Sequence, residues 1–204
     1  MLDVINFCVQ PAWWQGGLGL EMRARVRGLA ERLVQLYPDT TQGWAARAEL
    51  ATAVADTDPD RAAALLDACI DHASSTGGPA ARAGALFGKA VFLQNRGELE
   101  TARSLWQEAL EQELDPVVEA EAKLCLASAH ARADDADAAL ALFDQVAAAD
   151  AYPRDVRASA LILKAWTLRR VQRVEEARDL LQDVVAQFPG ETAAATASDL
   201  LLEF

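Results

Sequence analysis

The sequence lacks the motifs that mark catalytic and metal sites. Its two histidines, His72 and His130, are isolated, and its three cysteines, Cys8, Cys69 and Cys125, lie far apart. No group of Cys, His and Asp has metal-ligand spacing, and the sequence has no nucleophile elbow, no HExxH motif and no glycine-rich phosphate loop. We therefore predict no catalytic residue, no metal and no cofactor, and we expect that the protein is not an enzyme.

Long apolar runs and cysteines are also scarce. No stretch approaches the roughly 18 apolar residues that indicate a membrane-spanning helix. The first ten residues have no basic segment and carry Asp3, so we expect no signal peptide. An odd, sparse set of cysteines favours reduced thiols in a cytoplasmic protein over a disulfide framework.

Positive charge is in short supply. The chain has 19 Lys and Arg residues against 31 Asp and Glu residues, which gives a net charge of −12. A nucleic-acid-binding protein needs a cationic surface against the phosphates, and an anionic membrane surface likewise attracts basic residues. The composition therefore argues against nucleic acid and against membrane as partners.

Alanine, in contrast, is abundant, with 44 of the 204 residues. Alanine is the best helix former and lets helices approach closely. Hydrophobic residues make up 52% of the chain, which is enough for a sizeable core. Segments with the β-branched pattern of strands are few and short. We predict an all-α protein.

Small alanines recur at a nearly constant interval, with steps of 40, 37 and 38 residues, at Ala62, Ala102, Ala139 and Ala177. Four residues after each alanine stands a large side chain, namely Leu66, Trp106, Phe143 or Leu181. Three residues further on stands another apolar or small residue, namely Cys69, Ala109, Val146 or Val184. This spacing places each set on one helix face. A proline follows each set, at Pro79, Pro116, Pro153 and Pro189, where the helix cannot continue.

The periodicity predicts four helix pairs, at about 42–79, 80–116, 117–153 and 154–191. Residues 1–41 contain an N-terminal segment and one amphipathic helix that is half a repeat. Residues 192–204 form a terminal helix that caps the last repeat. We expect one continuous domain. Trp13 and Trp14 either pack on the first helix pair or dock on a partner or a second copy.

These repeats resemble the tetratricopeptide family. Its A-x3-F motif is matched by Ala102/Trp106 and Ala139/Phe143, and its L-G motif by Phe87-Gly88 and Leu126-Ala127. The resemblance implies an α-solenoid of antiparallel helix pairs, a right-handed superhelix whose first helices line a concave groove. It also implies binding of a peptide or protein segment in that groove, without catalysis. Armadillo and HEAT repeats, which have longer periods, are the alternative.

Charge differs between the two helices of each repeat. First-helix segments 80–96, 117–133 and 154–173 sum to +8, whereas second-helix segments 97–115, 134–151 and 174–191 sum to −14. One interpretation is that the basic layer is a binding surface. The other is that both layers are solvated and that neighbouring charges offset one another.

We predict a cytoplasmic interaction scaffold that binds an acidic or mixed protein or peptide segment in the groove. The basic residues would attract and orient the segment, and the apolar residues would contact it. The predicted partner-binding residues are Arg82, Lys89, Phe92, Leu93, Arg132, Trp166, Arg169 and Arg170. One alternative is a self-assembling structural protein, a homo-oligomer that uses its terminal segments. Another is a regulatory or sensor module for a separate effector.

Overall fold

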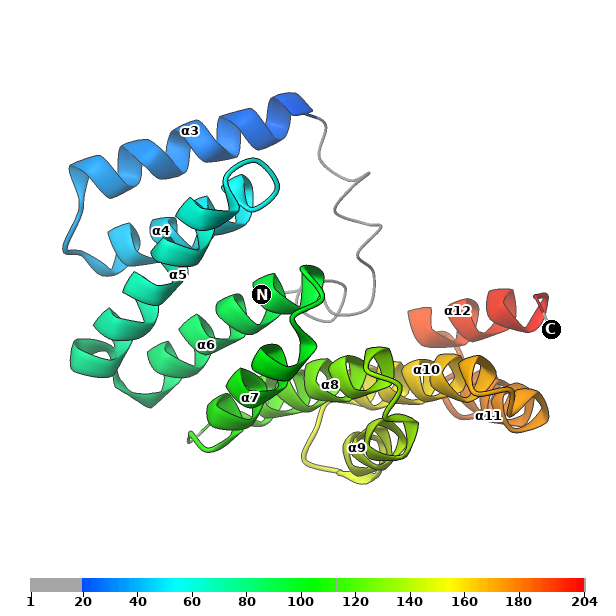
Figure 1. Cartoon of the computed structure of the whole chain (residues 1–204). Helices are drawn as coiled ribbons and strands as arrows, with labels where there is room; N and C mark the ends of the chain where they lie inside the picture. The colour runs from blue at the N-terminus through cyan, green and yellow to red at the C-terminus, as the bar shows by residue number, and fades with distance from the viewer. Residues whose placement is uncertain (1–19, 113, 204) are drawn as a thin grey trace. The chain divides into compact units, whose positions relative to one another are not determined.

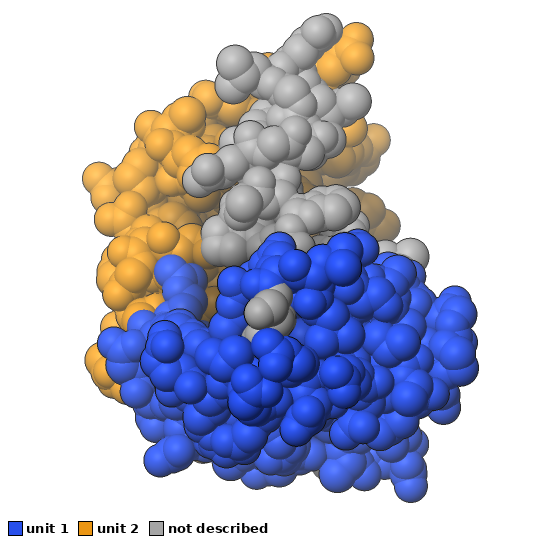
Figure 2. Space-filling view, turned by 90° about the vertical axis from the view of Figure 1, so that its right-hand side faces the viewer, with its two compact units in different colours: residues 1–9, 115–204 blue, residues 10–114 orange. Residues whose placement is uncertain are grey.

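The computed structural model describes residues 20–112 and 114–203, and the regular elements in this part of the chain are all helices (Figure 1). The chain divides into two compact units, coloured separately in Figure 2. Unit 1 comprises residues 1–9 and 115–204, and unit 2 comprises residues 10–114. The expectation of one continuous domain stays a prediction, and each unit is described separately.

The described part of unit 2 consists of α-helices that pack on one another in chain order. They are α3 (Leu20–Leu36), α4 (Thr41–Val54), α5 (Pro59–His72), α6 (Gly78–Asn95) and α7 (Leu99–Leu110). A π-helical turn, Ala73–Gly77, joins α5 to α6. The core lies between these helices and includes Ala30, Leu50, Val54, Leu66 and Leu93.

Unit 1 repeats the same arrangement with α8 (Pro116–Arg132), α9 (Ala136–Ala148), α10 (Arg154–Arg170), α11 (Val174–Gln187) and α12 (Thr192–Leu201). The first helices α8 and α10 contact each other, and α10 also contacts α12, so these three form one layer. The second helices α9 and α11 each pack between the first helices that precede and follow them. One core cluster joins α8, α9 and α10, and another joins α10, α11 and α12.

The packing positions predicted for the second helices are confirmed. Ala62, Ala102, Ala139 and Ala177 are all 0% exposed. The buried residues of α5, α7 and α11 are the predicted sets, and α9 adds Leu140 to its own. Trp106 is fully buried against Phe87, with ring centroids 4.7 Å apart. The alanines therefore mark where each second helix closes on its neighbours.

We expect Ala139→Leu to destabilise the fold by about 1–3 kcal/mol, because extra side-chain volume must enter a filled site. Ala139 packs with Phe143 and Leu124 in a cluster without room for it. Ala141→Leu, on the exposed side of the same helix, is the matched control and should change stability little. Urea unfolding compares the two variants. Equal stabilities would place Ala139 at the surface.

Three turns between first and second helices share one geometry. They span residues 96–98, 133–135 and 171–173, and the middle residue has a positive φ: 81° at Gly97, 62° at Asp134 and 65° at Gln172. The next amide donates to the carbonyl five residues back, at 3.0 Å for Glu98 to Leu93, 3.0 Å for Asp135 to His130 and 2.9 Å for Arg173 to Leu168. This is the Schellman helix end, which favours glycine at the left-handed residue. From sequence, a glycine stop is evident only in the first of the three turns.

Gln172→Gly should stabilise the fold by about 1 kcal/mol, because the left-handed conformation is unfavourable for residues with a β-carbon. Gly97→Gln, the converse change in an equivalent turn, should destabilise by a similar amount. Both differences are measurable by denaturant unfolding. If Gln172→Gly lowered the midpoint, the turn would not have the geometry described.

Candidate partner-binding surface

The first helices of unit 1 present a row of solvent-facing residues. On α10 the row includes Ser159, Trp166 and Arg170, and on α8 the residues at the same spacing are Glu121, Ser128 and Arg132. Residues 7 and 11 positions apart lie on one face of a helix. Each of these side chains is exposed or half-buried, whereas the other faces of α8 and α10 carry buried apolar residues.

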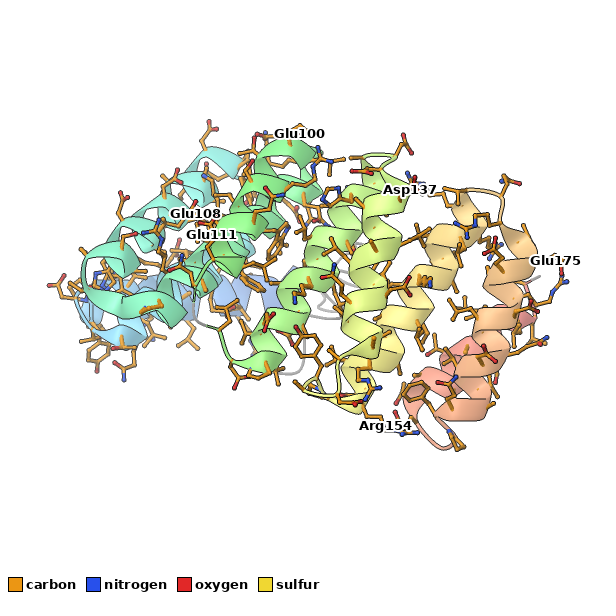
Figure 3. The ribbon with its side chains drawn as sticks, turned by 90° about the horizontal axis from the view of Figure 1, so that it is seen from below. Glu100, Glu108, Glu111, Asp137, Arg154 and Glu175 are labelled. Atoms are coloured by element: carbon orange, nitrogen blue, oxygen red, sulfur yellow. The ribbon has the colours of Figure 1, made fainter. Side chains whose placement is uncertain are left out.

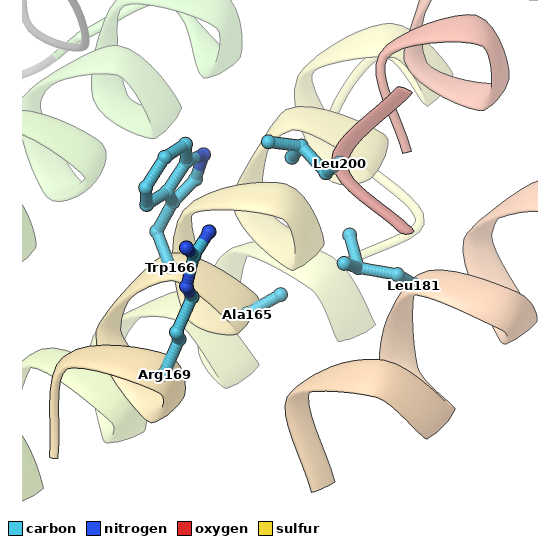
Figure 4. Close-up of a pocket in the computed structure, with 5 residues that line it drawn as sticks. All are labelled: Ala165, Trp166, Arg169, Leu181 and Leu200. Atoms are coloured by element: carbon cyan, nitrogen blue, oxygen red, sulfur yellow. The ribbon is translucent and has the colours of Figure 1, made fainter. Parts of the chain in front are cut away.

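Trp166 is the most prominent side chain of this row. It is 45% exposed, and the Arg169 guanidinium lies over its ring at 5.4 Å from the centroid. Figure 4 shows the two side chains next to each other on α10, beside a shallow recess that is also lined by Ala165, Leu181 and Leu200. The recess is shallow because Leu181 and Leu200 fill its floor as part of the core. It offers an aromatic face and a cation at one place.

Most basic residues of the first helices form ion pairs with acidic residues elsewhere in the same unit. In unit 1, Lys164 pairs with Asp144 at 2.5 Å, Arg169 with Glu203 at 3.0 Å, and Arg170 with Asp134. In unit 2, Lys89 pairs with Asp67 at 2.9 Å and Arg82 with Glu108. Figure 3 labels Glu108 together with other acidic side chains of the second helices. The interpretation that neighbouring layers offset each other's charge therefore accounts for most of the basic excess.

The predicted site residues divide between the two units. Arg82, Lys89, Phe92 and Leu93 lie on α6 of unit 2, and Arg132, Trp166, Arg169 and Arg170 lie on α8 and α10 of unit 1. Phe92 and Leu93 are buried in the core of unit 2, so they offer little surface to a partner. An apolar residue on a first helix can line a groove or join the core, and the sequence alone does not distinguish these two positions. The Lys89 side chain is only 14% exposed and is occupied by Asp67.

The other four predicted residues come together in unit 1. Arg132 and Arg170 are the last residues of α8 and α10, and Asp134, two residues after Arg132, binds Arg170. Within the described residues, Arg132 forms no ion pair and its side chain is exposed. Arg132 is therefore available to a ligand without displacement of another group.

Glu121 is a residue of this surface that the sequence does not single out. It is half-buried on α8, and burial raises the pKa of its carboxyl group. Two positions earlier, Glu119 accepts a hydrogen bond from Lys123, which lowers the pKa of Glu119. Helix α8 thus carries one carboxylate that accepts a hydrogen bond and another whose charged form is disfavoured by burial. The hydrogen bond from Lys123 and the difference in burial together distinguish the two.

We expect Glu121→Gln to raise stability at neutral pH, by less than about 1 kcal/mol because the side chain is partly solvated. A raised pKa means that the folded chain binds the proton more tightly than the unfolded chain. The stability of the wild type relative to the variant should therefore rise as pH falls from neutral through the folded-state pKa. Thermal unfolding across this range measures the difference, with Asp179→Asn on the exposed face of α11 as control. A constant difference would mean that Glu121 is fully solvated.

The remaining histidines, cysteines and tryptophans singled out from the sequence either have structural surroundings or lie outside the described residues. His130 binds Asp135 through Nδ1 at 2.8 Å, and Asp135 caps α9, so this pair is structural. No group of three metal-ligating side chains is found among the described residues, and no described helix is long and apolar enough to cross a membrane. Cys69 has a free, buried thiol, but Cys125 is disulfide-bonded, so the prediction of reduced thiols is wrong at Cys125. Trp13 and Trp14 lie outside the described residues.

Antiparallel helices that pack in sequential pairs, with an exposed surface on the first-helix layer, define a helical-repeat protein. Residues 159–190 match the family model of the tetratricopeptide repeat. Among solved structures, the chain is similar to the nearly identical TPR-like repeats assigned to a kinesin light chain of Podosopora anserina, with 20% identity, a TM-score of 0.66 and coverage of 90% of this chain and 92% of that one. A variant of those repeats matches with 19% identity and the same TM-score and coverage. No curated protein matches the chain.

The predicted resemblance and the all-α repeat fold are thus confirmed. At this level of identity the solved structures establish the fold alone. Tetratricopeptide repeats are generally modules for protein–protein interaction, and the family is generally non-catalytic. The four repeat boundaries, the site residues and the cytoplasmic location stay predictions.

Proposed function

We propose that the protein is a non-catalytic interaction scaffold that binds an acidic protein or peptide segment on the first-helix layer of unit 1. The observation that carries the proposal is Trp166, a large aromatic side chain left 45% exposed on α10 with the Arg169 guanidinium over its ring. Tryptophan and arginine are the residues most enriched in binding hot spots. The other apolar residues of α10 are buried or, at Leu161, half-buried, so the fold has no need for this exposure.

The charges beside Trp166 favour an acidic partner. Arg132 has no ion-pair partner in the described part of the chain, and Arg170 is held by Asp134, whose side chain is 90% exposed. Exposed ion pairs contribute only about 0–1 kcal/mol, so a carboxylate of a partner can replace Asp134. Arginine suits this role because its guanidinium group binds carboxylates with two parallel hydrogen bonds.

The segment we envisage carries an apolar side chain for the Trp166 face and carboxylates for the two arginines. The recess beside Trp166 is shallow, so the apolar group would lie against the ring and would not enter a deep pocket. The Ser128 and Ser159 hydroxyls donate to the Leu124 and Asp155 carbonyls at 2.8 Å, so toward an extended segment they can accept hydrogen bonds from backbone amides. The proposed contact surface therefore combines the aromatic side chain of Trp166 with the positive charges of Arg132 and Arg170.

Self-assembly through the C-terminal helix is the second candidate, and Leu202 supports it because its side chain is 87% exposed. Leu202 follows α12, and the exposed residues of the helix itself are small or polar, namely Thr192, Ala195, Thr196, Ser198 and Asp199. A polar outer face is typical of a cap that ends a solenoid. The contact area that remains is small for a stable dimer.

Arg169→Glu with Arg170→Glu should weaken binding to acidic peptides by at least about tenfold, because two attractive contacts become repulsive. The measurement is fluorescence anisotropy with short synthetic peptides graded from acidic to basic, each with one aromatic residue. Trp166→Ala should weaken the same peptides through loss of the apolar contact. Binding of acidic peptides should also weaken as ionic strength rises.

The matched control is Arg173→Glu with Arg178→Glu. These arginines have the same side-chain exposures as Arg170 and Arg169, 45% and 35%, and also form ion pairs, but they lie at the start of α11. The control changes net charge equally and should leave binding nearly intact. An equal loss in both variants would show a general charge effect. No loss at Arg169 and Arg170 would overturn the proposed surface.

A further inference from the structure

Helix α3 of unit 2 leaves an apolar row uncovered. Leu29 and Leu36, seven residues apart, are 61% and 63% exposed. Val26 and Leu33 lie half-buried beside them, which completes a stripe with spacing 3, 4 and 3. A different stripe of α3, centred on Ala30 and extended by Val34, packs into the core of unit 2. Thus α3 has two apolar stripes. Within the described residues, the stripe of Ala30 and Val34 is covered and the stripe of Leu29 and Leu36 is not.

The uncovered stripe has the spacing along which helices pack on each other. Apolar residues three and four positions apart form a seam that a second helix can cover. In this unit α4 packs on α3, α5 on α4, and α6 on α5. Figure 1 shows α4 and α5 on one side of α3. A further helix laid on the exposed stripe would continue this arrangement.

The uncovered stripe is bordered by positive charge. Arg25 and Arg32, four residues before and three residues after Leu29, are both exposed. Neither forms an ion pair within the described residues, whereas Arg27 on the same helix is paired with Glu31. Over its whole length α3 has four arginines and two glutamates, in a chain whose net charge is −12. Most basic residues of the first helices form ion pairs, whereas these two arginines do not.

We propose that the stripe of Leu29 and Leu36, with Arg25 and Arg32, docks an amphipathic helix of another protein that carries acidic residues beside its apolar face. The apolar residues of that helix would cover the two leucines, and its carboxylates would pair with the two arginines. This surface lies in unit 2 and is separate from the Trp166 surface of unit 1, so it is a second binding site.

The positive charges of Arg25 and Arg32 restrict which helix can bind to the exposed stripe of α3. A second copy that presented its own α3 would bring like charges together at Arg25 and Arg32, which is unfavourable. The acidic helix α11 of a second copy has Glu175, Asp179 and Asp183 exposed but carries no exposed large apolar side chain. Residues 1–19 contain a single acidic residue, Asp3. An acidic helix from a different protein fits both the leucines and the arginines.

The test uses the full chain and two synthetic amphipathic helices of equal length. Both have leucine at the core-facing positions, one with glutamate and the other with lysine at the flanking positions. By fluorescence anisotropy, the glutamate helix should bind at least about tenfold more tightly than the lysine helix. Arg25→Glu with Arg32→Glu should reverse this preference, and Leu29→Asp with Leu36→Asp should abolish binding of both helices.

Circular dichroism and the melting temperature of each variant verify that the fold is retained, as expected for exposed side chains. Arg173→Glu with Arg178→Glu, on unit 1, is again the control for net charge and should keep the preference for the glutamate helix. Arg169→Glu with Arg170→Glu should also keep it, which separates this proposal from the Trp166 surface.

Three results would overturn the proposal. Absence of binding by the glutamate helix would mean that the stripe is covered or inert. Equal binding of both helices would mean that the arginines select nothing. A concentration-dependent dimer in analytical ultracentrifugation, abolished by Leu29→Asp with Leu36→Asp, would make a second copy the occupant.

Discussion

The close approach of helices at a small residue is the constraint on which the structure depends. Ala62, Ala102, Ala139 and Ala177 are completely buried, and each stands where a second helix meets its neighbours. A side chain of any size there would push the helices apart and would expose the large residue one turn later. Because interiors are close-packed, such a displacement would spread through the neighbouring helices. The alanines thus set the distance at which each repeat closes.

The same close packing determines what the charges do. Once the helices are held together, bases on one helix lie within reach of acids on the next, and pairs such as Lys164 with Asp144 form. Each pair contributes little to stability, but together they neutralise most of the basic layer. Apart from Arg47, which donates to the Pro38 carbonyl, the cations left without a carboxylate among the described side chains are Arg25, Arg32 and Arg132. Both proposed binding surfaces contain them.

Two surfaces of different character result. On unit 1 an exposed aromatic ring and neighbouring arginines suit an extended acidic segment, because Trp166 offers a flat face. On unit 2 two exposed leucines and two arginines follow a helical seam, which suits a helix. We propose acidic partners for both surfaces, despite the acidic character of the whole chain.

The helices and their packing faces were predictable from local spacing, because residues i, i+4 and i+7 share a face whatever the helix packs against. The buried sets on α5, α7 and α11 follow from that rule alone. The burial of Phe92 and Leu93, the exposure of Trp166 and the identity of the ion pairs did not follow from it. Several of the ion pairs join side chains 20 to 40 positions apart, as in the bonds of Lys164 with Asp144 and of Arg170 with Asp134. Periodicity specifies which way a residue points along its own helix, whereas burial and charge pairing require the neighbouring helix to be in place.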